Sequence, residues 1–190
     1  MAIFERKDAN QLMRKLSHEE ISKHRVSKSH AKAIERLPIY GVLDNIRSLY
    51  NVGSIFRSSD GALVSGLFLC GYTPTPPRKE IDKTALGATE TVPWKYFPAS
   101  MDAINYARSK GATVFVLEQT TVSVPHYSVK KEDFPICLVV GNELTGISND
   151  VVSAADRALE IPMYGTKQSL NAAVAYGVAL YDLVRILKSD

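Results

Sequence analysis

Short apolar runs that alternate with helical segments recur along most of the chain. The runs "GLFLCG", "ATVFVLE" and "ICLVVG" are rich in apolar residues and are bounded by glycine or polar residues. Strands that are apolar on both faces and alternate with helices are typical of a parallel sheet covered by helices. The sequence therefore predicts an α/β fold, a mostly parallel sheet flanked by helices, and 190 residues suffice for one such core.

The N-terminal part differs from the rest of the chain in charge and in patterning. Residues 1–36 carry nine Lys and Arg against five Asp and Glu, whereas the whole chain has a net charge of +3. From Asp8 to about Glu35 the sequence lacks Gly and Pro and has loosely helical apolar spacing. We therefore expect a basic helical N-terminal extension over residues 1–37 and a domain over residues 38–190. The basic charge fits either a solvated helix face or an arm that follows a phosphate backbone.

Several classes of protein are disfavoured by features that the sequence lacks. No apolar run approaches the roughly 18 residues that a membrane-spanning helix needs. The N-terminus does not resemble a signal peptide, so we expect a cytoplasmic protein with no membrane partner. Cys70 and Cys137 lie in apolar runs and are expected to be buried thiols rather than a disulfide or a metal pair. The four histidines have no ligand spacing, and no metal is expected.

Three segments place polar residues and glycines directly after predicted strands, where open parallel sheets bind their ligands. They are "LDNIRSLYNVGSIFRSSD", "LVVGNELTGIS" and "EIPMYGTKQSLNAAVAYG". The first and third each run into a helix, for which we expect Asn51 and Ser169 as the N-caps. The second carries Glu143 after a buried strand. Neither a dinucleotide-binding G-x-G-x-x-G turn nor a phosphate-binding P-loop is present.

Arg57 is an unusual residue for the position that the pattern predicts. We expect it in the first turn of its helix, where the positive end of the helix dipole disfavours a cation. An anion at that helix start would reverse this argument, because backbone N–H groups and a guanidinium together bind phosphate or carboxylate. Taken singly, Glu143 and Ser169 are better explained by surface and capping roles.

Taken together, the three segments resemble the three motifs of the SpoU (TrmH-like) branch of the SPOUT RNA methyltransferases. "NVGSIFRSSDGA" is similar to the first motif, with its asparagine, glycine and arginine in register. "LVVGNELTGIS" is similar to the second, with its glycine-x-glutamate, and "IPMYGTKQSLNAAVA" to the third, with its serine-leucine-asparagine. The resemblance covers about residues 39–187. It departs before the first-motif asparagine, where the family often has a proline and this chain has "RSLYN".

The resemblance implies features that composition does not reveal. It implies a C-terminal deep trefoil knot, the SPOUT α/β knot, and a homodimer that packs through the knot region and the C-terminal helix. That helix carries small residues at Ala172, Ala173, Ala175, Gly177 and Ala179. Its larger apolar contacts would come from Leu170, Val174, Val178 and Leu183. Both sets fit a dimer interface as well as the core of a monomer.

The resemblance also implies methyl transfer from S-adenosylmethionine to a ribose 2′-hydroxyl in structured RNA. The cofactor is then expected to lie against Leu138, Gly141, Ile161, Met163, Ser169 and Leu170. The expected catalytic residues are Arg57, Asn51, Glu143, Ser169 and Asn171. Because a guanidinium almost never loses its proton in a protein, we expect Arg57 to bind an RNA phosphate and stabilise developing alkoxide rather than act as a base.

Two other hypotheses stay open on the sequence. One is a catalytically silent RNA-binding or ribosome-assembly factor on the same knotted scaffold. The other is a small-molecule enzyme with a flavodoxin-like topology, against which the missing phosphate-binding turns count. Among RNA substrates, the short basic extension favours transfer RNA over ribosomal RNA.

Overall fold

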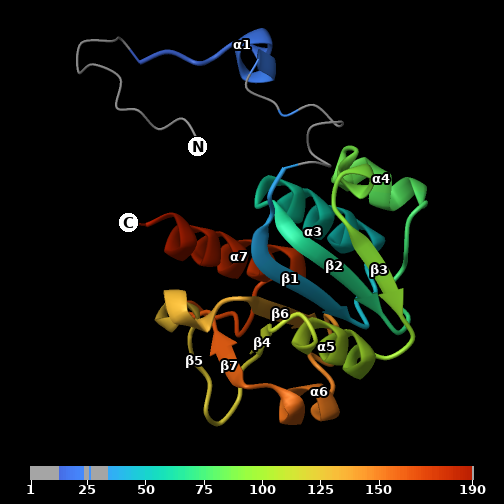
Figure 1. Cartoon of the computed structure of the whole chain (residues 1–190), viewed down its shortest axis with the longest axis vertical. Helices are drawn as coiled ribbons and strands as arrows, with labels where there is room; N and C mark the ends of the chain where they lie inside the picture. Colours follow the sequence, from blue (N-terminus) through green and yellow to red (C-terminus); the bar gives the residue numbers. More distant parts are fainter. Residues whose placement is uncertain (1–12, 24–25, 27–33, 190) are drawn as a thin grey trace. The chain divides into compact units, whose positions relative to one another are not determined.

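A computed structural model describes residues 13–23, 26 and 34–189 of the chain (Figure 1). The chain divides into two units, residues 1–33 and residues 34–190. Among the described residues of the first unit, one helix is formed, α1 (His18–Lys23). It lies within the predicted extension, most of which falls outside the described residues. The predicted end of that extension at residue 37 stays a prediction.

The second unit is built on a seven-stranded sheet in which all paired strands run parallel. The strand order is β3-β2-β1-β6-β4-β7-β5. The strands are β1 (Leu37–Asp44), β2 (Val64–Cys70), β3 (Trp94–Phe97), β4 (Thr113–Leu117), β5 (Val124–Pro125), β6 (Ile136–Gly141) and β7 (Arg157–Glu160). The predicted parallel α/β sheet flanked by helices is confirmed.

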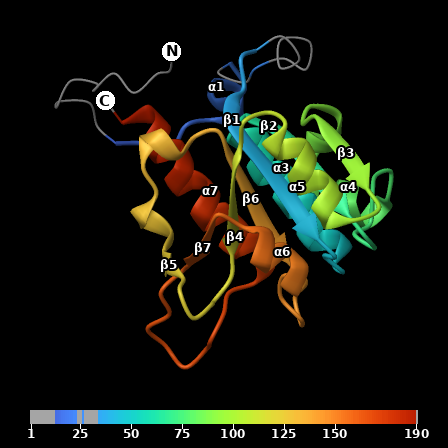
Figure 2. The same cartoon turned by 60° about the horizontal axis from the view of Figure 1, so that its bottom comes forward.

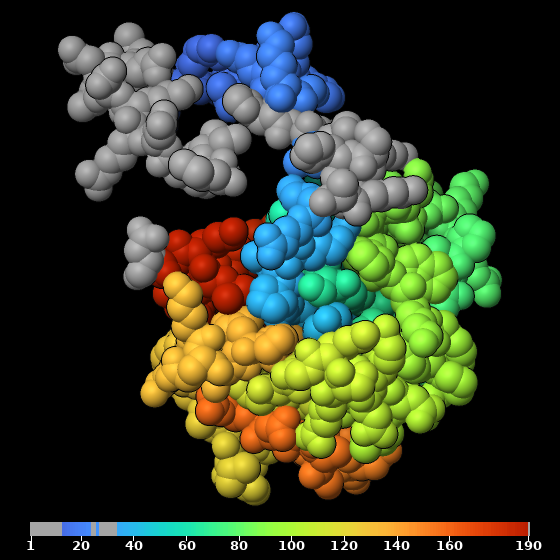
Figure 3. Space-filling view, viewed as in Figure 1, coloured from blue at the N-terminus to red at the C-terminus, as the bar shows by residue number. Residues whose placement is uncertain are grey.

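Helices cover both faces of this sheet. They are α3 (Leu49–Gly61), α4 (Lys79–Ala85), α5 (Ser100–Arg108), α6 (Asn149–Ala154) and α7 (Ala172–Lys188), with short 3-10 turns at Ala88–Glu90, His126–Ser128 and Lys131–Asp133. Helices α3 and α7 lie side by side (Figures 1 and 2). Figure 3 shows the face on which α5 covers part of the sheet.

Strand β6 is hydrophobic from Ile136 to Val140 because it contributes to a core on each face of the sheet. Ile136, Leu138 and Val140 contribute to the core beneath α3, α4 and α7. Cys137 and Val139 contribute to a second core beneath α5 and α6. Successive strand residues point to opposite faces, so a central strand with helices on both sides must be apolar at every position.

Cys70 and Cys137 are buried free thiols, as predicted. Burial raises the pKa of each thiol to about 12, so neither is a nucleophile near neutral pH. Among the residues that the structure describes, no group of His, Cys, Asp and Glu is arranged to hold a metal ion. In the same residues, no helix has the length and apolar character needed to cross a membrane.

Helices α3 and α7 begin at other residues than the sequence predicts. The N-cap of α3 is Ser48, whose side chain accepts a hydrogen bond from the backbone N–H of Asn51, so the prediction of Asn51 as N-cap is wrong. The N-cap of α7 is Asn171, so the prediction of Ser169 is also wrong. Serine and asparagine are both favoured N-caps, and each segment offers both within three residues. Arg57 is the ninth residue of α3 and lies in its third turn, so the expectation of a first-turn position is also wrong.

Candidate functional site

A cavity of about 360 Å³ lies where strands β4, β6 and β7 end. Its walls come from residues between 117 and 119 at the end of β4, between 140 and 146 at the end of β6, and between 159 and 175, from the end of β7 into the start of α7. Parallel strands place their carboxyl ends at one edge of a sheet, which brings together three loops that are distant in the sequence.

Five of the six residues expected to hold a cofactor line this cavity. They are Gly141, Ile161, Met163, Ser169 and Leu170. Leu138 does not line it, because its side chain is fully buried in the core beneath α3 and α7. Val140, on the same face of β6 and one pleat nearer the strand end, lines the cavity in its place.

Glu118 is a cavity residue that the sequence analysis missed. Its carboxylate accepts hydrogen bonds from the backbone N–H groups of Ile147, at 3.0 Å, and Gln119, at 3.0 Å. The Gln119 side chain donates to the carbonyl of Gln168, at 2.6 Å, and so joins two of the loops. Glu118 is the first residue after β4 and Glu143 is the second after β6, so the rule that singled out Glu143 would also have found Glu118.

The carboxylate of Glu143 accepts three hydrogen bonds at the start of α3. One oxygen accepts from the backbone N–H of Arg47, at 2.9 Å. The other accepts from the backbone N–H of Ser48, at 3.0 Å, and from the side-chain amide of Asn51, at 2.8 Å. Partial burial acts to raise the pKa of Glu143, but the donors from Arg47, Asn51 and Ser48 outweigh it, and the pKa lies below its ordinary value. Glu143 is therefore a poorly basic carboxylate that holds neighbouring groups in place.

The hydrogen bonds of Glu143 continue through two amides to α7. The side-chain oxygen of Asn51 accepts from the side-chain nitrogen of Asn171, at 3.0 Å. The oxygen of Asn171 in turn accepts from the backbone N–H groups of Ala173 and Val174, at 3.0 and 3.4 Å. A carboxylate only accepts and a backbone N–H only donates, so each amide in this chain has one allowed orientation. All three sequence segments are joined by this network.

Ser169 and Arg57 stand outside the network. Ser169 lines the cavity, and within the described residues its hydroxyl forms no hydrogen bond. Arg57 is exposed on α3, does not line the cavity, and has no hydrogen bond or ion pair to any described residue. It lies eight residues after the helix start, or about 12 Å along the axis. Within one chain, the structure thus brings together Asn51, Glu143, Ser169 and Asn171 but not Arg57.

The fold and the site define a class of parallel α/β protein with a ligand cavity at the strand ends and an asparagine–glutamate–asparagine network beside it. The SpoU rRNA Methylase family matches residues 38–181. The chain belongs to this family, and the family resemblance of the three sequence motifs is confirmed.

Three similar proteins illustrate the range of the family. The tRNA (guanosine(18)-2'-O)-methyltransferase of Aquifex aeolicus (strain VF5) is 32% identical over 145 residues, 75% of this chain and 66% of its own. The 23S rRNA (uridine(2479)-2'-O)-methyltransferase of Streptomyces viridochromogenes is 32% identical over 166 residues, 82% of this chain and 57% of its own. The AdoMet-bound rRNA methyltransferase of Sinorhizobium meliloti superposes with a TM-score of 0.75 at 29% identity, over 84% of this chain and 61% of its own. The chain therefore spans about three fifths to two thirds of these proteins.

Proposed function

We propose that the chain is an S-adenosylmethionine-dependent methyltransferase that acts on a ribose 2′-hydroxyl in structured RNA. The observation that carries this proposal is the network of Asn51, Glu143 and Asn171 beside the cavity. Family membership supports it, as do the 2′-O-methyltransferase activities for which two of the relatives are named. Membership of this family also argues against the flavodoxin-like small-molecule hypothesis.

The cavity has the chemistry that S-adenosylmethionine requires. Ile161, Met163 and Leu170 give the cavity an apolar part that suits an adenine ring, and polar side chains line much of the rest. The charged residues of its lining are all acidic, Glu118, Glu143 and Glu160, and this sign favours a cationic ligand. When bound, S-adenosylmethionine supplies a methyl group activated by its sulfonium charge.

Methyl transfer to a hydroxyl requires an aligned oxygen and removal of its proton. Glu143 is a poor base, because its pKa is lowered and both of its oxygens already accept hydrogen bonds, so we assign it a positioning role. Arg57 forms no hydrogen bond or ion pair with any described residue, and its guanidinium is a planar donor group that matches phosphate oxygens. In this proposal it binds an RNA phosphate and stabilises developing alkoxide, while the proton passes to water or another acceptor.

The activity is tested by calorimetry with S-adenosylmethionine and by transfer of labelled methyl groups to bulk bacterial tRNA and bulk ribosomal RNA. We expect cofactor binding and incorporation as 2′-O-methyl nucleosides. No binding at millimolar cofactor would favour the alternative, a catalytically silent RNA-binding or assembly factor.

We propose tRNA over rRNA as the substrate, on the basic charge of residues 1–36, and preferential labelling of rRNA would overturn that preference. For either substrate, we propose that the protein is located in the cytoplasm.

We also propose that the segment after β7 threads through a loop to form the trefoil knot. In support, the Gln119–Gln168 hydrogen bond joins this segment to the loop after β4, and α7 then returns to pack against β6 and α3 near the middle of the sheet. An experimental chain trace in which residues 161–190 pass outside every loop would refute this part of the proposal.

Helix α7 presents two different apolar faces, and we propose that the outer one forms a homodimer. Ala179 and Leu183 belong to the core of one chain. Val174, Val178 and Tyr181 are 51%, 40% and 51% exposed and recur at positions i, i+4 and i+7, so they form one stripe. Exposed apolar stripes of this kind mark interaction surfaces.

Val178→Lys is expected to convert the proposed homodimer into a monomer, because it places a charge in the middle of the stripe. Size-exclusion chromatography with light scattering measures the mass. Lys188→Glu changes an exposed residue at the far end of α7 and should leave the dimer intact. A wild-type protein that is monomeric at high concentration would contradict the homodimer.

Asn171→Asp is expected to separate the two roles of Asn171. Aspartate caps a helix as well as asparagine does, so α7 should keep its stability within a few tenths of a kcal/mol. A carboxylate cannot donate to the oxygen of Asn51, and turnover should fall about 10-fold or more, the effect of losing one well-placed hydrogen bond. Thermal melts and methyl-transfer rates measure the two effects. Asn171→Ala should lower both stability and turnover, and a fully active Asn171→Asp enzyme would show that the Asn51–Asn171 bond is dispensable.

A further inference from the structure

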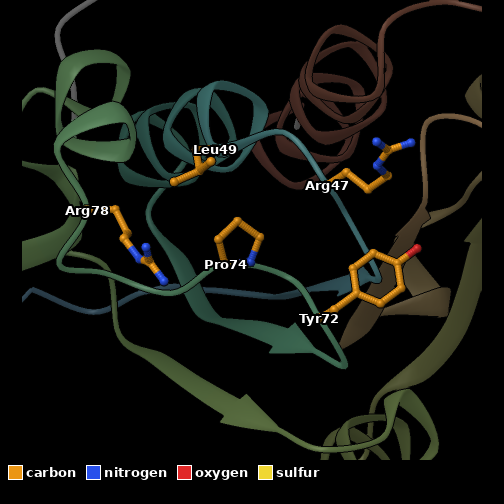
Figure 4. A pocket seen from close by; sticks show the side chains of 5 residues that line it. All are labelled: Arg47, Leu49, Tyr72, Pro74 and Arg78. Carbon is orange, nitrogen blue, oxygen red and sulfur yellow. The ribbon is translucent and has the colours of Figure 1, made fainter.

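A second, open pocket lies at the start of α3, where the loop after β1 faces the loop between β2 and α4 (Figure 4). Its volume is about 420 Å³, within the roughly 300–1,000 Å³ of small-ligand sites. It is lined by Arg47, Leu49, Tyr72, Pro74 and Arg78. Figure 4 shows Pro74 in the middle, with Arg78 on one side and Arg47 and Tyr72 on the other.

The charge of this pocket is entirely basic. Arg47 and Arg78 are exposed, and neither guanidinium forms a hydrogen bond or an ion pair with any described residue. Within the part of the chain that the structure describes, no acidic residue lines the pocket. A guanidinium presents a planar fork of donors that matches phosphate oxygens. The pocket is therefore suited to a phosphate group.

The uncharged part of the pocket offers a surface for a flat ring. The Tyr72 side chain is 60% exposed, although its hydroxyl accepts a hydrogen bond from the side-chain amide of Asn142, at 2.8 Å. The same amide nitrogen donates to the carbonyl of Asn45, at 2.9 Å. The Asn142 side chain is thus fixed by the backbone, and it fixes the hydroxyl end of Tyr72 in turn. An exposed aromatic ring that is fixed in this way is typical of sites where proteins stack an unpaired base.

Hydrogen bonds link the pocket to the proposed cofactor cavity. Asn142 and Glu143 line the cavity. Asn142 donates to the hydroxyl of Tyr72, and Glu143 accepts from the backbone N–H of Arg47. Two residues that line the cavity thus each bond to a residue that lines the pocket, so an RNA strand bound in the pocket would lie near the cavity.

We propose that this pocket binds a short stretch of the substrate RNA strand, with a base on the ring of Tyr72 and different phosphates of the strand at Arg47 and at Arg78. The substrate class rests on the proposed methyltransferase function. The pocket adds the residues that hold the strand beside the reacting ribose. Arg47, Tyr72 and Arg78 are thus assigned to RNA binding, whereas the network of Asn51, Glu143 and Asn171 positions the reacting groups.

The charge of the pocket is tested with Arg47→Ala and Arg78→Ala, against Lys79→Ala as a matched control. Lys79 is exposed and adjacent in sequence but does not line the pocket. With bulk bacterial tRNA and bulk ribosomal RNA as probes, each arginine variant should weaken RNA binding about 10-fold, the effect of one charge-assisted hydrogen bond to phosphate. The slope of log affinity against log salt should fall by roughly 0.7–0.9 for each phosphate that the variant no longer neutralises. Affinity for S-adenosylmethionine should not change.

The base contact is tested with Tyr72→Phe and Tyr72→Ala. The phenylalanine keeps the ring and should bind RNA within about 3-fold of wild type, whereas the alanine should bind about 10-fold more weakly or worse because it cannot stack on a base. Ultraviolet crosslinking of the wild-type protein to the same RNA should label the peptide that contains Tyr72. Arginine variants that match Lys79→Ala in affinity and salt slope would overturn the proposal, as would a crosslink confined to other peptides.

Binding and crosslinking need no methyl transfer, so these measurements separate the pocket from the activity. A protein that transfers no methyl group but loses RNA binding in the arginine variants would overturn the proposed function and support the pocket. A protein that methylates RNA, but whose arginine variants bind RNA as tightly as the wild type, would support the proposed function and overturn the pocket.

Discussion

Gly141→Ala is expected to abolish binding of S-adenosylmethionine and to lower the free energy of unfolding by about 2–3 kcal/mol. A Cβ atom at this position would overlap the backbone of Gly146 and Ile147. Those atoms belong to a tight turn closed by two backbone hydrogen bonds between Asn142 and Gly146, at 3.1 and 3.0 Å. A side chain could rotate away from the new methyl group, but this backbone cannot, so the turn that forms one wall of the cavity must open.

Calorimetry with S-adenosylmethionine and chemical denaturation measure the two effects of Gly141→Ala. Gly177→Ala is the matched control, because the nearest atom to a Cβ there is the Ser58 hydroxyl, at 3.7 Å, an ordinary contact. Replacing a glycine inside a helix should leave the protein unchanged or stabilise it by up to about 1 kcal/mol. Normal cofactor affinity in Gly141→Ala would mean that the turn does not shape the cofactor site.

The fold was largely predictable because it follows from the period of the apolar residues. The run from Ile136 to Val140 is apolar at every position, and only a central strand with a core on each face requires that. In α7 the helical period of 3.6 residues separates buried apolar residues from exposed ones. Val174 and Leu183 are nine residues apart, which places them on opposite sides of a helix, and the structure exposes the first and buries the second.

The helix starts, and with them the place of Arg57, were not predictable from residue type alone. Ser48 and Asn51 are both good caps, and the choice depends on which residue takes the extended backbone conformation, as Ser48 does. A first-turn position would give Arg57 an unfavourable place in the helix dipole, but even counted from Asn51 it is the sixth residue, in the second turn. Its actual place in the third turn removes that argument, and its exposure and lack of partners among the described residues now support a contact with RNA.

The residues of the site were easier to predict than their interactions. Glu143 was singled out because it follows a buried strand, yet its partners lie more than 90 positions away in the sequence, at Arg47, Ser48 and Asn51. No local pattern shows such a contact. The path of the chain, and so a knot, is a property of the whole topology and is even further from what residue patterns show.

Glu143→Ala is expected to reduce turnover by about 100-fold, since displacement of catalytic groups by about 1 Å can cost that much. Without the carboxylate, the amide of Asn51 and the loop before α3 lose the acceptor that fixes them. The loss of free energy of unfolding should be only about 1 kcal/mol, because the freed backbone N–H groups of Arg47 and Ser48 can bond to water at the surface. Methyl-transfer kinetics and denaturation measure the two quantities, with Glu132→Ala as the control at an exposed carboxylate outside the cavity.

The pH dependence of stability distinguishes this positioning role from an ordinary surface charge. The pKa of Glu143 in the folded protein lies below its ordinary value of 4.5, so its stabilising effect is complete above pH 4.5 and is lost as the pH falls through the lowered pKa. Glu143→Gln cannot ionise, and its amide nitrogen meets a donor wherever it points. The stability difference between wild type and Glu143→Gln should therefore be largest at neutral pH and shrink in acid. A difference that is constant with pH would make Glu143 an ordinary surface charge, and a variant with low stability and normal turnover would give it a structural role only.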